Sequence, residues 1–291
     1  MIKILKDSFN ILKNNMLFIQ PILLFLLFVF IGLPHLSPLN TNLISKITLN
    51  ITLGLLFCAF CSGWFYINKL AVESYTEKTE KETEEAEETE EITKKSIENL
   101  KQFFTGVGTN FLNFLGGYTL LFLISLIIIY VIIKICIEQY GLIQLPEIQN
   151  VENFFNTLSQ EDKITLSKWI LTIMPISFLS QYLFVLYSAI LLFDKKNIFI
   201  TLFNTIKFFF KNIILNIGLI ILLPLIQFII HAPAQVIGKN TIGITLNIIA
   251  TTIYFAFYTM VIFRLYSEKT KISSNNRAEF SGEDSSIDSS I

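Results

Sequence analysis

Few residues in this 291-residue chain could carry chemistry, and the most suggestive of them are two cysteines. Cys58 and Cys61 have the spacing of a redox dithiol. They lie in an apolar stretch without charged residues, where a thiolate is destabilised rather than activated. Cys136 makes the number odd, and the spacing does not indicate a disulfide-stapled secreted fold. The sequence therefore favours three unreactive cysteines over a redox site.

The two histidines, His35 and His231, are the next candidates. Both fall at the outer ends of apolar stretches, where a pair of imidazoles could bind a metal ion or sense pH. The alternative is that they are interfacial histidines with no shared role. Because the sequence offers no third ligand, it favours this alternative, and we predict no metal site.

Motifs of enzymes are missing from the sequence. It contains no Gly-rich phosphate loop, no paired-His zinc motif and no Ser nucleophile elbow. We therefore expect no catalytic residue, no cofactor and no enzymatic activity. The net charge of −1 gives no indication of a nucleic-acid partner.

Neutral polar side chains within the apolar stretches could instead line a pathway for a substrate. The four main candidates are Gln20, Gln181, Asn216 and Gln227. The alternative is hydrogen bonding between helices, worth about 0.6 to 2 kcal/mol per contact in membranes, and this is the interpretation that we favour. Three prolines would each loosen one backbone hydrogen bond and bend a helix, as they do in transporters and in ordinary bundles: Pro21, Pro175 and Pro224.

The elements that position these residues follow from the hydrophobic pattern. Hydrophobic residues make up 53% of the chain and charged residues only 15%, against about 25% in a typical soluble domain. Six stretches lack Asp, Glu, Lys and Arg and can cross a hydrocarbon core of about 30 Å: 17–33, 49–68, 111–133, 169–193, 213–230 and 242–263. Backbone groups in lipid must be paired within the segment, so we predict an all-α integral membrane protein with about six transmembrane helices. Their lack of ionisable groups argues against ion-coupled transport.

The distribution of lysine and arginine predicts the orientation, because cytoplasmic loops retain positive charge. One side of the predicted topology holds 17 basic residues, and the other holds only Lys46, Lys134, Lys163, Lys168 and Lys239. Both termini are therefore expected on the cytoplasmic side of the membrane. The first apolar stretch is expected to be an uncleaved anchor, since no small-x-small cleavage site follows it.

A short amphipathic segment precedes each odd-numbered span and is expected to lie in the membrane interface. In the first segment, the predicted apolar face opposes Lys3, Lys6, Asn10 and Lys13 and consists of Ile2, Leu5, Phe9 and Leu12. Two similar segments follow, over residues 97–107 and 198–211. We therefore predict three repeats of an interfacial helix plus a helical hairpin, all in the same membrane orientation. Gly106 and Gly108 are expected to form a flexible joint between the second interfacial helix and its span.

The domain organisation follows from the remaining polar segments. We expect one membrane domain over residues 1–266, interrupted by a Glu-rich cytoplasmic linker at 73–95 that stays solvated or forms a loose single helix. Residues 267–291 have the composition of a disordered cytoplasmic tail. In the longest external loop, Val151, Phe154, Phe155 and Leu158 suggest a short interfacial helix, and residues 159–162 resemble a capping box.

A short motif near the start of the chain occurs a second time. The chain opens with Met1-Ile2-Lys3-Ile4-Leu5-Lys6-Asp7-Ser8-Phe9-Asn10-Ile11-Leu12-Lys13-Asn14-Asn15. Within this segment, Phe9-Asn10-Ile11-Leu12-Lys13 is similar to Phe203-Asn204-Thr205-Ile206-Lys207. With its layout, the chain resembles a group of bacterial six-helix inner-membrane proteins. This group includes the YciC-like proteins and the membrane domain attached to some glycerophosphodiester phosphodiesterases. The resemblance covers most of residues 1–266 and implies a module of undefined activity in a bacterial inner (plasma) membrane. It does not extend to a phosphodiesterase domain, and the Glu-rich insertion departs from the compact loops expected of the group.

These observations lead to two functional expectations. The first is a non-enzymatic membrane module that organises lipids or partner membrane proteins. The alternative is a permease or transporter subunit for a neutral or apolar solute, which would use the polar residues named above. The expected partners are membrane lipids, with other membrane proteins as a second candidate.

Overall fold

The computed structural model describes most of the chain, and the regular elements in the described part are all helices. No strand occurs among those residues. The described residues are 1–29, 43–81, 89–142, 158–237 and 241–283. The all-α prediction is thus confirmed for this part of the protein.

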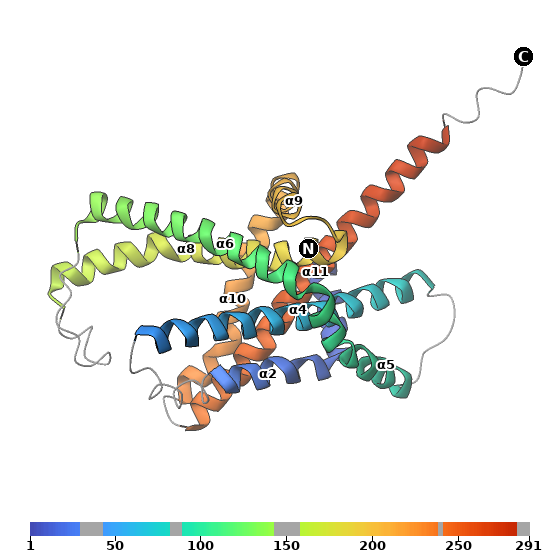
Figure 1. Ribbon diagram of the computed structural model, residues 1–291, viewed down its shortest axis with the longest axis horizontal. Helices are drawn as coiled ribbons and strands as arrows, with labels where there is room; N and C mark the ends of the chain where they lie inside the picture. Colours follow the sequence, from blue (N-terminus) through green and yellow to red (C-terminus); the bar gives the residue numbers. More distant parts are fainter. Residues whose placement is uncertain (30–42, 82–88, 143–157, 238–240, 284–291) are drawn as a thin grey trace, which may run out of the picture. The chain divides into compact units, whose positions relative to one another are not determined.

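The described residues contain ten helical elements. Figure 1 shows how they are arranged. In order, they are α1 (Ile2–Asn14), the 3-10 helix η1 (Met16–Phe18), α2 (Ile19–Leu27), α4 (Leu43–Lys81), α5 (Thr89–Lys101), α6 (Phe103–Tyr140), α8 (Gln160–Asp194), α9 (Ile198–Lys211), α10 (Ile213–Ile237) and α11 (Thr241–Glu283).

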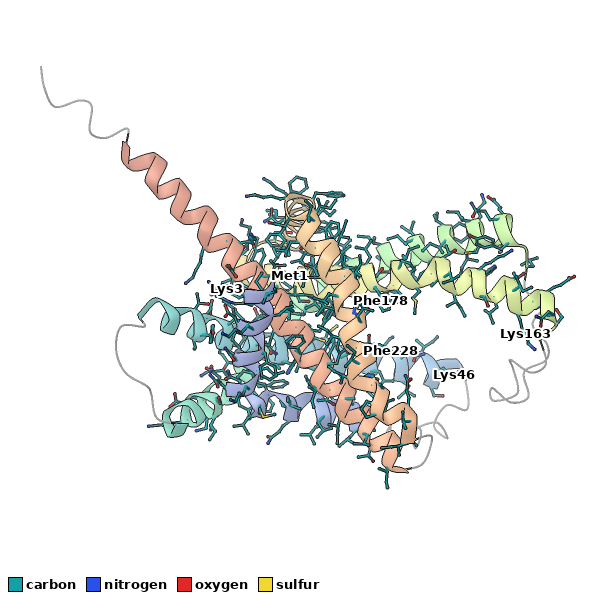
Figure 2. The ribbon with its side chains drawn as sticks, turned by 180° about the vertical axis from the view of Figure 1, so that it is seen from behind. Met1, Lys3, Lys46, Lys163, Phe178 and Phe228 are labelled. Carbon is teal, nitrogen blue, oxygen red and sulfur yellow. The ribbon has the colours of Figure 1, made fainter. Side chains whose placement is uncertain are left out.

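Five of the described helices are long and apolar enough to cross a membrane: α4, α6, α8, α10 and α11. Large apolar side chains stand exposed along them, with Ile214 88%, Leu112 76% and Leu171 71% accessible. Figure 2 shows such side chains around the helices, including Phe228 on α10. A surface of this kind is unfavourable in water but is covered by lipid tails in a bilayer. The protein is accordingly a multi-pass membrane protein, and its described elements are all helical.

The predicted first span is only partly described. α1 and the following η1–α2 segment meet at a bend of 82°, and together they have the apolarity and length of a sixth candidate span. Residues 30–33 of the predicted span lie outside the described residues. The bend separates the amphipathic α1 from the apolar α2, as expected if α1 lies along an interface and α2 enters the membrane.

The described chain clusters into two compact units. The first comprises residues 1–116 and 185–291, and the second comprises residues 117–184. Within the second unit, α6 and α8 form a hairpin in which the rings of Tyr118 and Phe184 lie 4.3 Å apart. At the other end of this hairpin, the hydroxyls of Thr172 and Tyr140 are 3.4 Å apart. A single domain over 1–266 stays a prediction.

The N-terminus of α8 carries the predicted capping box. The amide of Asp162 donates to the hydroxyl oxygen of Ser159 at 3.1 Å, and that hydroxyl donates to the Asp162 carboxylate at 2.6 Å. This pairing satisfies one of the free amides at the start of the helix. The capping-box prediction is therefore confirmed. Leu158 is buried, whereas the predicted interfacial helix over Val151, Phe154 and Phe155 lies outside the described residues.

The predicted glycine joint is wrong. The break between α5 and α6 falls at Gln102, and α6 runs without interruption through Gly106 and Gly108. A Cβ atom on Gly106 would stand 2.6 Å from the Cβ of Tyr66 on α4, whereas one on Gly108 would meet nothing within 4 Å. Gly106 therefore allows α4 and α6 to approach closely and does not act as a hinge.

The polar segments are more helical than their composition suggests. α4 continues to Lys81 and α5 begins at Thr89, so helix enters the Glu-rich linker from both sides. α11 continues to Glu283, although residues from 267 onward have the composition of a disordered tail. A preformed helix lengthens without a new nucleation cost, and this favours helical extensions of α4 and α11. Residues 82–88 and 284–291 lie outside the described residues.

Candidate functional site

Helix α1 has three distinct faces. Ile4 and Ile11 are buried, Ile2 and Phe9 are 81% and 59% exposed, and a third face carries exposed lysines. These are Lys3, Lys6 and Lys13. The predicted apolar face is thus divided, because Ile2 and Phe9 point outward while Leu12 is buried. The buried face, which the sequence analysis did not predict, packs on α11.

An acidic residue lies in the middle of this buried face. Asp7 accepts two hydrogen bonds from Arg264 of α11 at its Oδ2 atom, from Nη2 at 2.9 Å and from Nε at 3.2 Å. Both residues are buried, with 8% and 4% of their surface accessible. A buried carboxylate or guanidinium is stable only with such a partner, so the pair holds α1 against α11.

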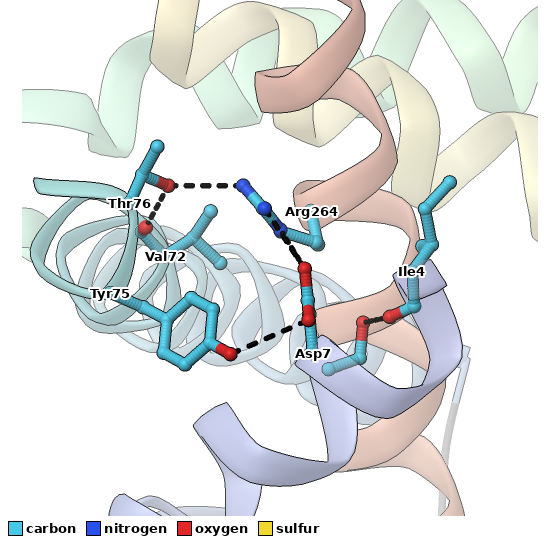
Figure 3. A network of polar contacts seen from close by, with 7 residues as sticks. Ile4, Asp7, Val72, Tyr75, Thr76 and Arg264 are labelled. Carbon is cyan, nitrogen blue, oxygen red and sulfur yellow. Dashed lines mark hydrogen bonds and ion pairs between the residues drawn. The ribbon is translucent and has the colours of Figure 1, made fainter. Parts of the chain in front are cut away.

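Two residues of α4 complete this polar network (Figure 3). Arg264 donates from Nη1 to the hydroxyl oxygen of Thr76 at 3.2 Å, and the Tyr75 hydroxyl donates to Oδ1 of Asp7 at 3.4 Å. The guanidinium also stands 5.7 Å from the centre of the Tyr75 ring. Three helices distant in the sequence therefore meet at one buried charge pair. We call Asp7, Tyr75, Thr76 and Arg264 the α11 junction.

A second carboxylate, that of Asp194, contacts α11 at Tyr266, two residues after Arg264. The Tyr266 hydroxyl donates to Oδ1 of Asp194 at 2.6 Å, at the end of α8. Asn204 of α9 donates to the other oxygen of Asp194 at 3.3 Å, and Lys196 lies 3.5 Å from it. Asp194 thus links α9 to α11, as Asp7 links α1 to α11.

Loss of the Tyr266 hydroxyl should weaken this link. We expect Tyr266→Phe to lower the free energy of unfolding by about 1.5 to 3 kcal/mol, because a hydrogen bond to a charged acceptor is removed. Thermal unfolding in detergent can be followed with a thiol-reactive dye, since the described cysteines are all buried and none forms a disulfide. The matched control is Tyr130→Phe, whose side chain is 70% exposed and should leave stability unchanged. Equal stability of wild type and Tyr266→Phe would contradict this account.

Sequence reasoning did not single out these carboxylates, although a signal existed. Asp7 is the only acidic residue before Glu73, and Asp194 is the only one between Asp162 and Glu268. A lone acid in a long basic and apolar segment needs a partner when it is buried. The partner itself has no local signature, because Arg264 lies 257 residues from Asp7.

Helix α9 has the same kinds of faces as α1. Its buried side chains include Thr201 and Thr205, whereas Phe199 and Phe203 are 69% and 66% exposed. Exposed lysines again occupy a separate face, namely Lys207 and Lys211. The Phe-Asn motif that α9 shares with α1 therefore places an exposed phenylalanine and a half-buried asparagine in both helices.

The predicted polar pathway residues have separate environments. Gln20 is exposed on α2, and Gln181 belongs to the second unit. Asn216 is fully buried in α10 and donates to the backbone oxygen of Phe209 at 2.8 Å, across the joint between α9 and α10. Gln227 is half-buried, about three turns along the same helix. For Asn216, the contact is that of a packing residue at a helix joint.

The candidate metal and redox residues make no described metal site. His231 lies with its Nε2 atom 3.4 Å from the Thr251 hydroxyl, and its buried Nδ1 has no hydrogen-bond partner. His35 lies outside the described residues. None of the three described cysteines, Cys58, Cys61 and Cys136, forms a disulfide. Within the described ranges, no three His, Cys, Asp or Glu side chains form a group that could hold a metal ion.

Comparisons with known proteins identify no relative of this chain. No protein-family model, no curated protein and no solved structure matches the chain.

Proposed function

We propose that the protein is a non-enzymatic module of a bacterial inner membrane that organises lipids or partner membrane proteins at the cytoplasmic leaflet. The observation that carries the proposal is the surface of α1 and α9. Each helix is fixed to the bundle on one face and presents exposed phenylalanine and lysine side chains on the others. Such a helix is suited to lie in the plane of a membrane interface.

The angular order of the three faces supports the same orientation for both helices. Each residue advances about 100° around the helix axis. Measured from the buried face, the exposed apolar face is rotated by about 160° and the lysines by about 230°, both in α1 and in α9. Two helices with this order can lie on one leaflet with their phenylalanines at the same depth. The arrangement is the one that a repeat in constant membrane orientation requires.

The ends of the two helices also agree. Asn15 closes α1 with φ −124° and ψ 39°, and Asn212 closes α9 with φ −118° and ψ 35°. Each side-chain amide donates to the carbonyl four residues earlier, Ile11 at 2.9 Å and Phe208 at 3.1 Å. These matching joints favour the proposed repeat for its first and third copies. Membership of the YciC-like group is part of the same proposal.

Electrostatics favour an anionic leaflet as the surface that α1 and α9 contact. A lysine near such a surface gains about 1 kcal/mol. The exposed lysines of both helices belong to the side that holds 17 of the 22 basic residues in the proposed topology, with both termini cytoplasmic. The exposed phenylalanines would then insert beside the acyl chains while the lysines contact phosphate groups.

Lipid retention tests this proposal. We expect the protein purified in mild detergent to retain phosphatidylglycerol, and the Lys3→Gln, Lys6→Gln, Lys13→Gln triple variant to retain several-fold less, because three attractive charges are lost. The amount bound is measured by mass spectrometry of co-purified lipids. The matched control removes three exposed lysines of the opposite predicted side, namely Lys46, Lys134 and Lys168. Equal retention by both triple variants would count against a lipid-organising module.

Uptake measurements separate this function from the alternative. A permease for a neutral or apolar solute would give substrate-dependent uptake into reconstituted vesicles, and Gln181→Leu would abolish it. A lipid-organising module gives no such uptake, and its lipid retention does not depend on Gln181.

A further inference from the structure

Helices α4 and α11 cross in the core of the first unit (Figure 1). Trp64 stacks on Phe255 with ring centres 5.2 Å apart, and its neighbour Phe65 stacks on Phe263 at 5.7 Å. Phe255 and Phe263 stand one turn before and one turn after Thr259. Thr259 therefore lies at the point where α11 passes over Trp64 and Phe65.

Asn68 belongs to the same crossing. It follows Trp64 by one turn on α4, and none of its surface is accessible. Its amide nitrogen donates to the backbone oxygen of Trp64 at 2.6 Å. Because the nitrogen faces its own helix, the amide oxygen Oδ1 is directed away from that backbone carbonyl, and this buried atom has no hydrogen-bond partner.

The hydroxyl of Thr259 is unusual among the buried threonines that the structure describes. Four others donate to the carbonyl one turn earlier in their own helix, at 2.7 to 3.0 Å: Thr76, Thr201, Thr205 and Thr252. Thr259 is fully buried, and its hydroxyl has no partner. Its polar group is therefore not satisfied by its own helix.

Two orphaned polar atoms at one helix crossing point to a ligand. A buried donor or acceptor without a partner is costly, and native structures satisfy nearly all of them with protein or ordered water. We propose that a buried water molecule bridges α4 and α11 here, accepting a hydrogen bond from the Thr259 hydroxyl and donating one to Oδ1 of Asn68. Two polar partners are the minimum that an internal water needs.

The charges around the crossing favour water over a metal cation. The ionised groups nearest in the sequence are the cations Lys69 and Arg264. Their carboxylate partners are already engaged, Glu73 at 3.4 Å from Lys69 and Asp7 at 2.9 Å from Arg264. A cation at the crossing would have neutral oxygen ligands and positive neighbours, whereas a water molecule needs no compensating charge.

The direction in which the Thr259→Val substitution changes the Tm tests the proposal. If the hydroxyl of Thr259 is an unsatisfied group, Thr259→Val removes a buried polar atom at constant shape and raises the Tm. If the hydroxyl binds a bridging water, the same change removes a satisfied hydrogen bond and lowers the Tm by about 2 to 4 °C. We expect the fall, and a rise or an unchanged Tm overturns the proposal. The matched control is Thr252→Val. The buried Thr252 hydroxyl donates to the carbonyl of Ile248, which keeps its backbone amide donor when the hydroxyl is removed. No atom loses its only partner in this variant, so its Tm should stay closer to that of the wild type.

Two further measurements keep the test decisive. The Tm shifts of Asn68→Leu and Thr259→Val should not add in the double variant, since either change alone removes the bridge; additive shifts contradict it. In the wild-type protein in bilayers, solid-state NMR should show magnetisation transfer from water to the Thr259 and Asn68 side chains. Leu223 of α10, which is fully buried, is the dry reference, and transfer no faster than to Leu223 overturns the proposal.

Discussion

Replacing Asp7 with alanine is expected to lower the free energy of unfolding by about 3 to 5 kcal/mol, among the largest effects of any single change in the chain. The substitution leaves the buried guanidinium of Arg264 without its carboxylate, and an uncompensated buried charge is strongly destabilising. Thermal or denaturant unfolding in detergent, followed by dye labelling of the buried cysteines, measures the loss. Asp7→Asn should lose less, because the amide oxygen still accepts a hydrogen bond.

An exposed ion pair provides the control for this effect. Glu138 lies 3.8 Å from Lys134, with side chains 63% and 66% accessible. Glu138→Ala removes the same charge from a solvated pair and should change stability by less than about 1 kcal/mol. If Asp7→Ala and Glu138→Ala lose similar amounts, the α11 junction does not hold the bundle together.

The charge pair can also be replaced as a whole. In the Asp7→Leu, Arg264→Met double variant, no buried charge remains, and much of the stability lost in Asp7→Ala should return. This recovery would show that the stability lost in each single variant comes from the buried charge that is left without its partner. Such a variant would keep α1 in place while removing the charges, so its lipid retention reports on the lysines of α1 alone.

Local patterns in the sequence predict some joints of the fold, although not the one between α5 and α6. The N-terminal box at Ser159 and the ends of the first and third amphipathic segments fall where the residue types indicate. Each of these features is decided by atoms within four residues of one another, so a short sequence motif contains the information.

The α11 junction could not be predicted in the same way. Asp7, Thr76 and Arg264 meet only because three helices pack together, and no spacing in the sequence connects them. The amphipathic pattern of α1 separates lysine from apolar residues but does not show which apolar side faces protein and which faces lipid. Hydrocarbon and protein interior favour similar side chains, so hydropathy cannot divide them.

Glycines are ambiguous for a related reason. A glycine can serve a hinge through its free backbone or a helix crossing through its missing side chain, and both uses have the same sequence. Gly106 and Gly108 are two residues apart and were predicted to act together. The structure separates them, because Gly106 faces Tyr66 and Gly108 has open space around its Cα atom.

The Gly106→Leu substitution is therefore expected to lower the free energy of unfolding by more than about 3 kcal/mol, or to prevent assembly of α4 with α6. Even the first atom of a side chain would stand 2.6 Å from the Cβ of Tyr66, which cannot move without the α4 backbone. Overpacking of this kind typically costs about 1 to 3 kcal/mol for a few added atoms, and Gly106→Ala should fall in that range.

The neighbouring glycine gives the comparison that decides between hinge and crossing. Gly108→Leu adds the same side chain where nothing lies within 4 Å, and Gly108→Ala should stabilise the helix by up to about 1 kcal/mol. A hinge would make both positions sensitive, since both would need backbone freedom. Sensitivity at Gly106 alone, measured as the difference in unfolding temperature between the two leucine variants, identifies a close helix crossing; equal losses at both positions would restore the hinge.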